Sequence, residues 1–161
     1  GQFIHLSTGK TGNFILRYIE KVSKAYLFES DRRWKKALEL SLKKFSDKVV
    51  MCDGYLGLCD GKDSGSLDTM IRGRLDFLKM DIEGAEPMAL LGGRKVLLNN
   101  NVKCSICSYH RYNDVNTISD ILQLYGYRTN TSDCYMLFFH EKDIFSSIDF
   151  SRGIVYVRKY R

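Results

Sequence analysis

The stretch FLKMDIEGAE, residues 77–86, joins a short apolar segment to a cluster of charged residues. The apolar part predicts a buried strand over 75–80. Pro87 follows the charges at once, and proline is well tolerated in the first turn of a helix, so we expect a helix over 86–98. A strand followed directly by a helix is the repeating unit of α/β proteins.

The charges in this stretch are candidates for a functional site. In a strand, Lys79, Asp81 and Glu83 point to one side. Charged groups at the end of a buried strand are costly unless they pair or serve a site. Lys79 is therefore expected to pair with Asp81 or Glu83 and to keep one carboxylate ionised. The alternative is purely structural, with Asp81 and Glu83 capping the helix and Glu86 exposed.

Outward from this stretch, apolar periodicity alternates between strand and helix. Strands are expected at 2–6, 25–28, 49–52, 75–80 and 102–109, and helices at 12–22, 31–45, 86–98 and 113–125. The tail is aromatic and β-branched at 135–140 and 154–157, which predicts a strand pair. The fold class is therefore α/β, a doubly wound, mostly parallel sheet flanked by helices, with a C-terminal antiparallel hairpin.

The connection between residues 52 and 75 departs from this pattern. It is rich in glycine, and only residues 66–71 have the composition of a short helix. Two explanations stay open: the crossover is mostly loop, or residues have been lost from it. We expect residues 1–161 to form a single domain, and Gly1 in place of an initiating Met leaves room for a missing upstream segment.

Composition narrows the class of protein. The chain of 161 residues carries 25 Lys and Arg against 19 Asp and Glu, a net charge of +6, and its apolar content of 44% excludes a disordered chain. No apolar run approaches the roughly 18 residues of a membrane helix, and no signal peptide is evident. Five cysteines, an odd number, suit reduced thiols, so we expect a cytoplasmic protein without a membrane span.

The loop after the first strand is the first candidate ligand site. Ligands of doubly wound sheets bind at the carboxyl ends of the strands. The small residues Ser7, Thr8, Gly9 and Gly12 would let the backbone approach a cofactor there. A phosphate-binding P-loop is excluded because Ile4 occupies the position of its first glycine, and Ser7 replaces the first glycine of a dinucleotide fingerprint. A simple turn is the alternative.

Two further strands are followed directly by candidate ligand-binding residues. Glu29, with Ser30, follows the second strand, where an acid can accept the hydroxyl groups of a ribose. The alternative is that Ser30 or Asp31 caps the next helix while Glu29 is solvated. Asp53 and Gly54 follow the third strand, where they would contact an adenine amino group or simply form a turn.

These motifs together resemble the FkbM family of S-adenosylmethionine-dependent methyltransferases. The resemblance runs from about residue 25 to the C-terminus. The matching stretches are Phe28-Glu29, Ser66-Leu67-Asp68, Leu78 to Glu86 (LKMDIEGAE), Leu90 to Gly93 (LLGG), Ser108-Tyr109-His110 and Tyr125-Gly126-Tyr127.

The resemblance implies a class I methyltransferase sheet that holds S-adenosylmethionine along the strand ends, with Glu29 on its ribose. It also implies O-methylation of a hydroxyl on a sugar or secondary metabolite, so the expected partner is a small-molecule or glycan acceptor. Asp81 and Glu83 match the acidic motif at which donor and acceptor meet. The chain departs from the family at residues 5–12, where an acid and a glycine-alanine loop are expected.

Methyl transfer to a hydroxyl needs an aligned acceptor and a general base. The candidate catalytic residues are Asp81, Glu83 and His110, with Lys79 orienting or tuning one carboxylate; His110 as a structural strand-end histidine is the alternative. No zinc site is expected, because Cys104 and Cys107 lie within an apolar strand and no second pair completes a ligand set. The acids near Asp81 could hold Mg²⁺, but nothing in the sequence requires a metal.

Two other functions compete with catalysis. The altered first loop favours a degenerate methyltransferase-like binding module with impaired donor binding. The basic runs 32–36 and 158–161 suggest nucleic-acid binding as the second competing function. We disfavour the latter, because the first run lies on an amphipathic helix whose cations are expected to form a solvated face.

Overall fold

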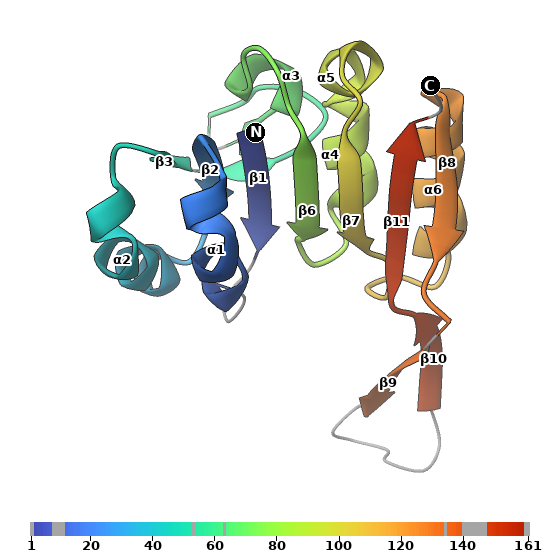
Figure 1. The fold of residues 1–161 in the computed structure, drawn as a ribbon. Helices are drawn as coiled ribbons and strands as arrows, with labels where there is room; N and C mark the ends of the chain where they lie inside the picture. The colour runs from blue at the N-terminus through green and yellow to red at the C-terminus, as the bar shows by residue number, and fades with distance from the viewer. Residues whose placement is uncertain are drawn as a thin grey trace.

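The computed structural model describes residues 2–7, 12–52, 54–62, 64–133, 135–139 and 148–159. Its centre is a seven-stranded sheet with the order β3-β2-β1-β6-β7-β11-β8, and Figure 1 shows these strands side by side from β3 on the left to β8 on the right. The neighbouring strands from β3 to β7 run parallel, and β11 runs antiparallel to both β7 and β8. The predicted doubly wound, mostly parallel sheet is confirmed, and strand order reverses between β1 and β6.

The strands of this sheet are β1 (Gln2–Ser7), β2 (Lys24–Phe28), β3 (Val49–Cys52), β6 (Phe77–Asp81), β7 (Lys103–Cys107), β8 (Tyr127–Thr131) and β11 (Ile154–Lys159). The helices are α1 (Gly12–Tyr18), η1 (Ile19–Lys21), α2 (Arg32–Ser41), η2 (Lys43–Phe45), α3 (Leu67–Met70), α4 (Glu86–Leu91), α5 (Arg94–Asn99) and α6 (Asp114–Leu124).

Two apolar cores lie on opposite faces of the sheet. The smaller core packs α1 and α2 against one face of β2, where Ala25 and Leu27 are buried. The larger core packs α3 to α6 against the other face, where Tyr26 and Phe28 are buried. Alternate residues of one strand thus serve both cores, which explains why the buried run in β2 is continuous rather than alternating.

The C-terminal strands pair differently from the prediction. The expected hairpin of residues 135–140 with 154–157 is wrong. β9 (Tyr135–Phe139) pairs with β10 (Ile148–Arg152) in a separate ribbon that extends beyond the end of the sheet (Figure 1). β11 instead inserts between β7 and β8, and β8 is a strand that the sequence analysis missed.

The single helix expected over 86–98 is also wrong. The chain forms α4 and α5, separated at Gly92 and Gly93. A Cβ at Gly92 would collide with the carbonyl oxygen of Gly57 from another loop, so close approach of two backbones requires glycine there. The side chain of Asp68 then caps α5 from a distance, because it accepts hydrogen bonds from Lys95 N (3.0 Å) and Val96 N (2.8 Å).

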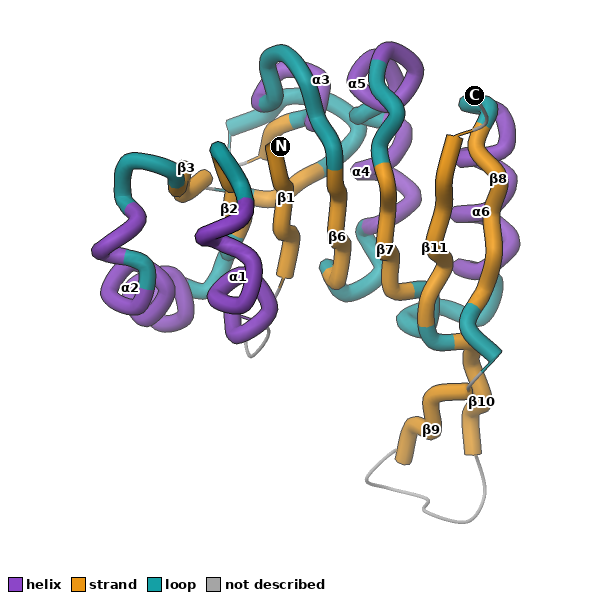
Figure 2. The backbone as a smooth tube through the Cα atoms, in the orientation of Figure 1, coloured by secondary structure: helices purple, strands orange, loops and turns teal. Residues whose placement is uncertain are grey.

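The connection from β3 to β6 is mostly loop, as Figure 2 shows. It contains α3 and two short parallel strands, β4 (Tyr55–Leu56) and β5 (Ser64–Gly65). Asp60 organises it by accepting hydrogen bonds from Ser66 N (2.8 Å) and Thr69 Oγ1 (2.7 Å). The loop explanation of this crossover therefore holds.

Within the described part of the chain, no helix has both the length and the apolar character that a membrane crossing requires.

Candidate active site

The turn from β6 to α4 places the charged stretch at the switch point of the sheet. β1 and β6 are neighbours there, with Ser7 opposite Asp81 in register. The turn uses two left-handed residues, Glu83 (φ 56°) and Gly84 (φ 87°). A Cβ on Gly84 would lie 2.8 Å from Arg111 Nε, so the turn packs directly against the loop that follows β7. This packing brings the ends of β6 and β7 together.

Asp81 is the centre of the polar cluster formed there. Its Oδ1 lies 3.2 Å from His110 Nε2 and accepts a hydrogen bond from the Tyr109 hydroxyl at 3.0 Å. Lys79 Nζ lies 3.9 Å from Oδ2, which is the expected pairing of Lys79 with Asp81. The hydrogen bond with His110, aided by Tyr109 and Lys79, outweighs partial burial and lowers the pKa of Asp81 to about 2. Asp81 is therefore a carboxylate at neutral pH.

His110 contacts three carboxylates at once. Besides Asp81, its Nε2 lies 3.4 Å from Glu86 Oε1, and its Nδ1 lies 3.4 Å from Glu83 Oε2. Burial opposes a charged imidazole, but the hydrogen bond with Asp81 and the charges of Glu86 and Glu83 outweigh it and raise the pKa of His110. The structure thus joins the four predicted catalytic residues, Lys79, Asp81, Glu83 and His110, in one cluster.

Glu86 is a member of the cluster that the sequence analysis did not select. Its side chain is 0% exposed, so the exposed Glu86 of the structural alternative is wrong. Oε1 accepts a hydrogen bond from Ile82 N (2.8 Å), whereas Oε2 has no hydrogen-bond partner among the described residues. Burial raises the pKa of Glu86. The capping alternative also lacks support, because α4 follows Ala85 without a side-chain cap.

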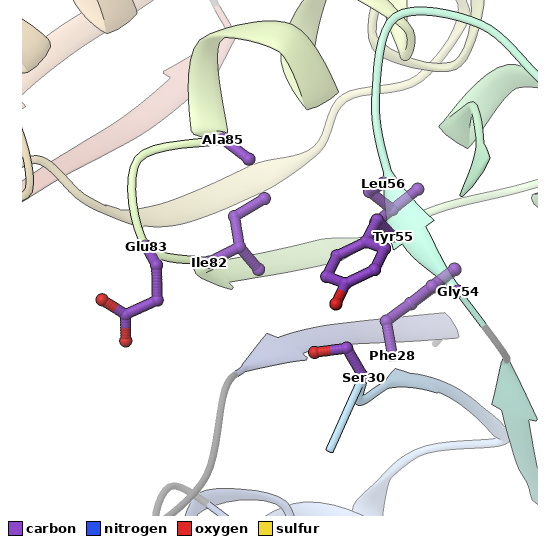
Figure 3. Close-up of a pocket in the computed structure, with 8 residues that line it drawn as sticks. All are labelled: Phe28, Ser30, Gly54, Tyr55, Leu56, Ile82, Glu83 and Ala85. Atoms are coloured by element: carbon purple, nitrogen blue, oxygen red, sulfur yellow. The ribbon is translucent and has the colours of Figure 1, made fainter. Parts of the chain in front are cut away.

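A cavity of about 290 Å³ opens beside this cluster. Figure 3 shows the Tyr55 ring and the Ile82 side chain projecting toward each other across it, with Phe28 and Ser30 on the β2 side. Its lining residues are Phe28, Ser30, Gly54, Tyr55, Leu56, Ile82, Glu83 and Ala85. Glu83 belongs to both the cavity wall and the charged cluster, so the two features form one site.

Comparison with known families identifies the domain. Residues 61–129, which include β6, the charged turn and β7, match the family described as "Methyltransferase FkbM domain". This part of the chain is therefore similar to an FkbM methyltransferase domain. The resemblance drawn from the sequence is confirmed, and this family implies S-adenosylmethionine as its cofactor.

Solved structures agree on the fold of this chain. It is similar to the methyltransferase FkbM from Methylobacillus flagellatus KT, with a TM-score of 0.68 and 22% identity over 97% of this chain and 43% of that one. It is also similar to a SAM-dependent O-methyltransferase from Thermotoga maritima (TM-score 0.59, 11% identity, 99% of this chain and 59% of that one).

A third similar structure is a putative methyltransferase from Streptococcus mutans in complex with SAH (TM-score 0.53, 11% identity, 99% of this chain and 88% of that one). The chain thus spans less than half of the Methylobacillus protein. No curated protein matches this chain.

The predicted donor residues that the structure describes lie at the same end of the sheet. Ser30 and Gly54 (φ 89°) line the cavity. Ser7 ends β1 and Gly12 begins α1, whereas Thr8, Gly9 and Asp53 lie outside the described residues. The aromatic walls, Phe28 and Tyr55, were not selected from the sequence, although each is adjacent to a residue that was.

Glu29 is buried, 3% exposed, which contradicts the solvated carboxylate of the alternative. Its Oε1 accepts a hydrogen bond from Asp31 N (2.9 Å), and Asp31 caps α2 through a bond from Arg33 N (2.8 Å), so the capping part of that alternative is correct. Glu29 is not among the residues lining the cavity.

The cysteines of β7 belong to the core of the sheet. Cys104 and Cys107 are free and buried, as predicted. Burial raises the pKa of Cys107 to about 11, which keeps its thiol protonated.

Proposed function

We propose that the FkbM domain transfers a methyl group from S-adenosylmethionine to a hydroxyl oxygen of a small-molecule or glycan acceptor. One observation carries this proposal: an apolar cavity lies at the switch point of the sheet and shares Glu83 with a carboxylate–imidazole cluster. The cavity can take a nucleoside, and the cluster can take a proton. Methyl transfer from a nucleoside donor to a hydroxyl requires both a nucleoside pocket and a proton acceptor.

The cavity fits the nucleoside part of the donor. Phe28, Tyr55 and Ile82 offer apolar and aromatic surface for an adenine ring, and the volume of 290 Å³ is near the lower end of the roughly 300–1,000 Å³ typical of ligand pockets. Glu29, directly after Phe28, is the acid we assign to the ribose hydroxyl groups. When bound, S-adenosylmethionine supplies an electrophilic methyl group on a sulfonium.

Glu83 is the residue we assign as general base. Its side chain is 68% exposed and belongs to the cavity wall, so an acceptor hydroxyl can reach it. His110 orients Glu83 through Nδ1, and Asp81 fixes His110 through Nε2. A positioned carboxylate that removes a proton contributes roughly 10²- to 10⁴-fold to the rate. Asp81, Lys79 and His110 then act by positioning.

A donor-binding-impaired binding module is the second candidate. The observation that favours it is the loop sequence His5-Leu6-Ser7-Thr8-Gly9-Lys10-Thr11-Gly12, which lacks the family's acid and adds a lysine near the expected sulfonium. A positive charge near the sulfonium would weaken donor binding by like-charge repulsion.

Calorimetry with S-adenosylmethionine and with its demethylated product separates these candidates. The enzyme is expected to bind both ligands at micromolar concentration, and then to methylate a member of a panel of hydroxylated sugars and metabolites. Absence of binding at high micromolar ligand would overturn the enzyme and favour the binding module. Donor binding without turnover on any hydroxyl compound would instead contradict the acceptor class.

A further inference from the structure

Carboxylates outnumber cationic side chains in the Asp81 cluster. Asp81, Glu83 and Glu86 all face the single imidazole of His110, and Lys79 Nζ lies 3.9 Å from Asp81 Oδ2. Asp114, which is 3% exposed, adds a further negative charge that acts on Glu86. Buried excess charge is costly unless it is paired or coordinates a metal.

The imidazole of His110 cannot satisfy its three partners in a neutral state. A neutral ring carries one N–H, so in either tautomer a nitrogen lone pair faces a carboxylate. Nε2 faces two carboxylate oxygens, at 3.2 Å from Asp81 Oδ1 and 3.4 Å from Glu86 Oε1. A single Nε2–H cannot align with both oxygens, so at least one of the two hydrogen bonds is weak. Glu86 Oε2 has no hydrogen-bond partner among the described residues.

We propose that Asp81, Glu86 and His110 form a binding site for a divalent first-row transition metal ion. The ligand atoms of these three residues all lie within 4.8 Å of one another. Ligands about 2.1 Å from a metal lie about 3.0–3.4 Å apart in octahedral or tetrahedral geometry, which agrees with the two distances from His110 Nε2. One imidazole and two carboxylates suit Mn²⁺ or Zn²⁺ and do not suit soft ions that prefer thiolates.

Glu83 completes this arrangement from the other side of the ring. With a metal on Nε2, the Nδ1–H of His110 donates to Glu83 Oε2, 3.4 Å away. A carboxylate on the second nitrogen is the usual partner of a metal-bound histidine, because it fixes the tautomer and the ring orientation. The buried Glu86 carboxylate, whose Oε2 has no hydrogen-bond partner in the described part of the chain, gains a ligand bond.

The ion would lie at the edge of the proposed methyl-transfer cavity, next to Glu83. There it would polarise an acceptor hydroxyl and lower its pKa. This consequence rests on the proposed function, whereas ion binding itself does not.

Titration of the metal-free protein with Mn²⁺, followed by the electron paramagnetic resonance signal of free Mn²⁺, tests the site without donor or acceptor. The wild type is expected to bind one Mn²⁺ per chain, and Zn²⁺ to displace it. Glu86→Gln and Asp81→Asn should each weaken binding by at least about tenfold. Glu39→Gln, which removes the same charge from the exposed face of α2, is the matched control and should bind as the wild type does.

The proposal is overturned if the folded wild type binds no Mn²⁺ even at millimolar concentration, so that all the added Mn²⁺ stays free. Equal Mn²⁺ affinities of Glu86→Gln and Glu39→Gln would also overturn it. Far-UV circular dichroism checks the fold of each variant. Asp81→Asn keeps the test decisive if Glu86→Gln does not fold, because Asp81 lies at a strand end with a side chain 14% exposed. Separate calorimetry with S-adenosylmethionine distinguishes failure of the metal site from failure of the methyltransferase.

Discussion

Glu83 adopts a left-handed backbone conformation (φ 56°), the one non-glycine residue with positive φ in the described ranges. Such a conformation costs on the order of 1–3 kcal/mol, and it persists where the surrounding structure fixes it. Here the next residue, Gly84, packs against Arg111, and the Glu83 carboxylate reaches His110. The strained turn therefore places Glu83 in the cavity wall while its carboxylate contacts His110, and this is the carboxylate that we assign as general base.

Substitutions at Glu83 should separate stability from turnover. Glu83→Gly relieves the strained backbone, so we expect the free energy of unfolding in urea to rise by about 0.5–1 kcal/mol. Glu83→Gln keeps the side-chain shape and loses the charge, and we expect kcat to fall about 100-fold with unchanged donor affinity. Both variants are compared with Glu39→Gln. Wild-type kcat in Glu83→Gln would remove Glu83 from the role of base.

Glu29 should control donor affinity. Glu29→Ala is expected to weaken binding of S-adenosylmethionine in calorimetry by at least about tenfold, which corresponds to about 1.4 kcal/mol. Because Glu29 also accepts a hydrogen bond from Asp31 N, the variant perturbs the start of α2. Asp31→Ala perturbs the same helix start and serves as the control. An equal loss of affinity in both variants would assign the effect to α2 and contradict the ribose role.

At the scale of elements, the interruption between α4 and α5 fixes the crossover loop against the sheet. Gly92 contacts the backbone of Gly57, while Asp68 from α3 caps α5. The stretch LLGG (90–93), part of the resemblance, thus has a packing reason in this chain. It shapes the wall that carries Tyr55 and Leu56, which line the cavity.

A pair of glycine substitutions tests this contact. Gly92→Ala forces a methyl group against the Gly57 carbonyl oxygen, so we expect the free energy of unfolding to fall by about 1–3 kcal/mol. Gly57→Ala is the matched control, because a Cβ there meets nothing within 4 Å. Urea denaturation measures both. Equal stability of the two variants would show that the loop can move away from Gly92 without cost.

At the scale of the whole molecule, the sequence predicted what local patterns encode. Apolar periodicity located the strands of the main sheet before α6 but missed the short β4 and β5. Spacing placed Lys79, Asp81 and Glu83 on one side of a strand end. Strand pairing in the tail was not predictable, because 135–139 and 154–159 are both apolar strand formers and nothing local indicates that β11 inserts between β7 and β8. Glu86 was missed for a related reason: its burial depends on His110, which is distant in sequence.

Because the cavity draws its walls from β2, the β4 loop and the β6 turn, donor binding should stabilise the entire fold. A ligand at 100 times its Kd adds about 2.7 kcal/mol to the free energy of unfolding, which for a chain of this size raises Tm by roughly 5–10 °C. We expect this shift in differential scanning calorimetry with the demethylated donor. Glu29→Ala, at the same ligand concentration, should show a smaller shift, since its Kd is higher. A wild-type Tm that does not change, although calorimetric titration detects binding, would show that the ligand binds outside this cavity or to the unfolded chain, and would contradict a donor site built from both halves of the sheet.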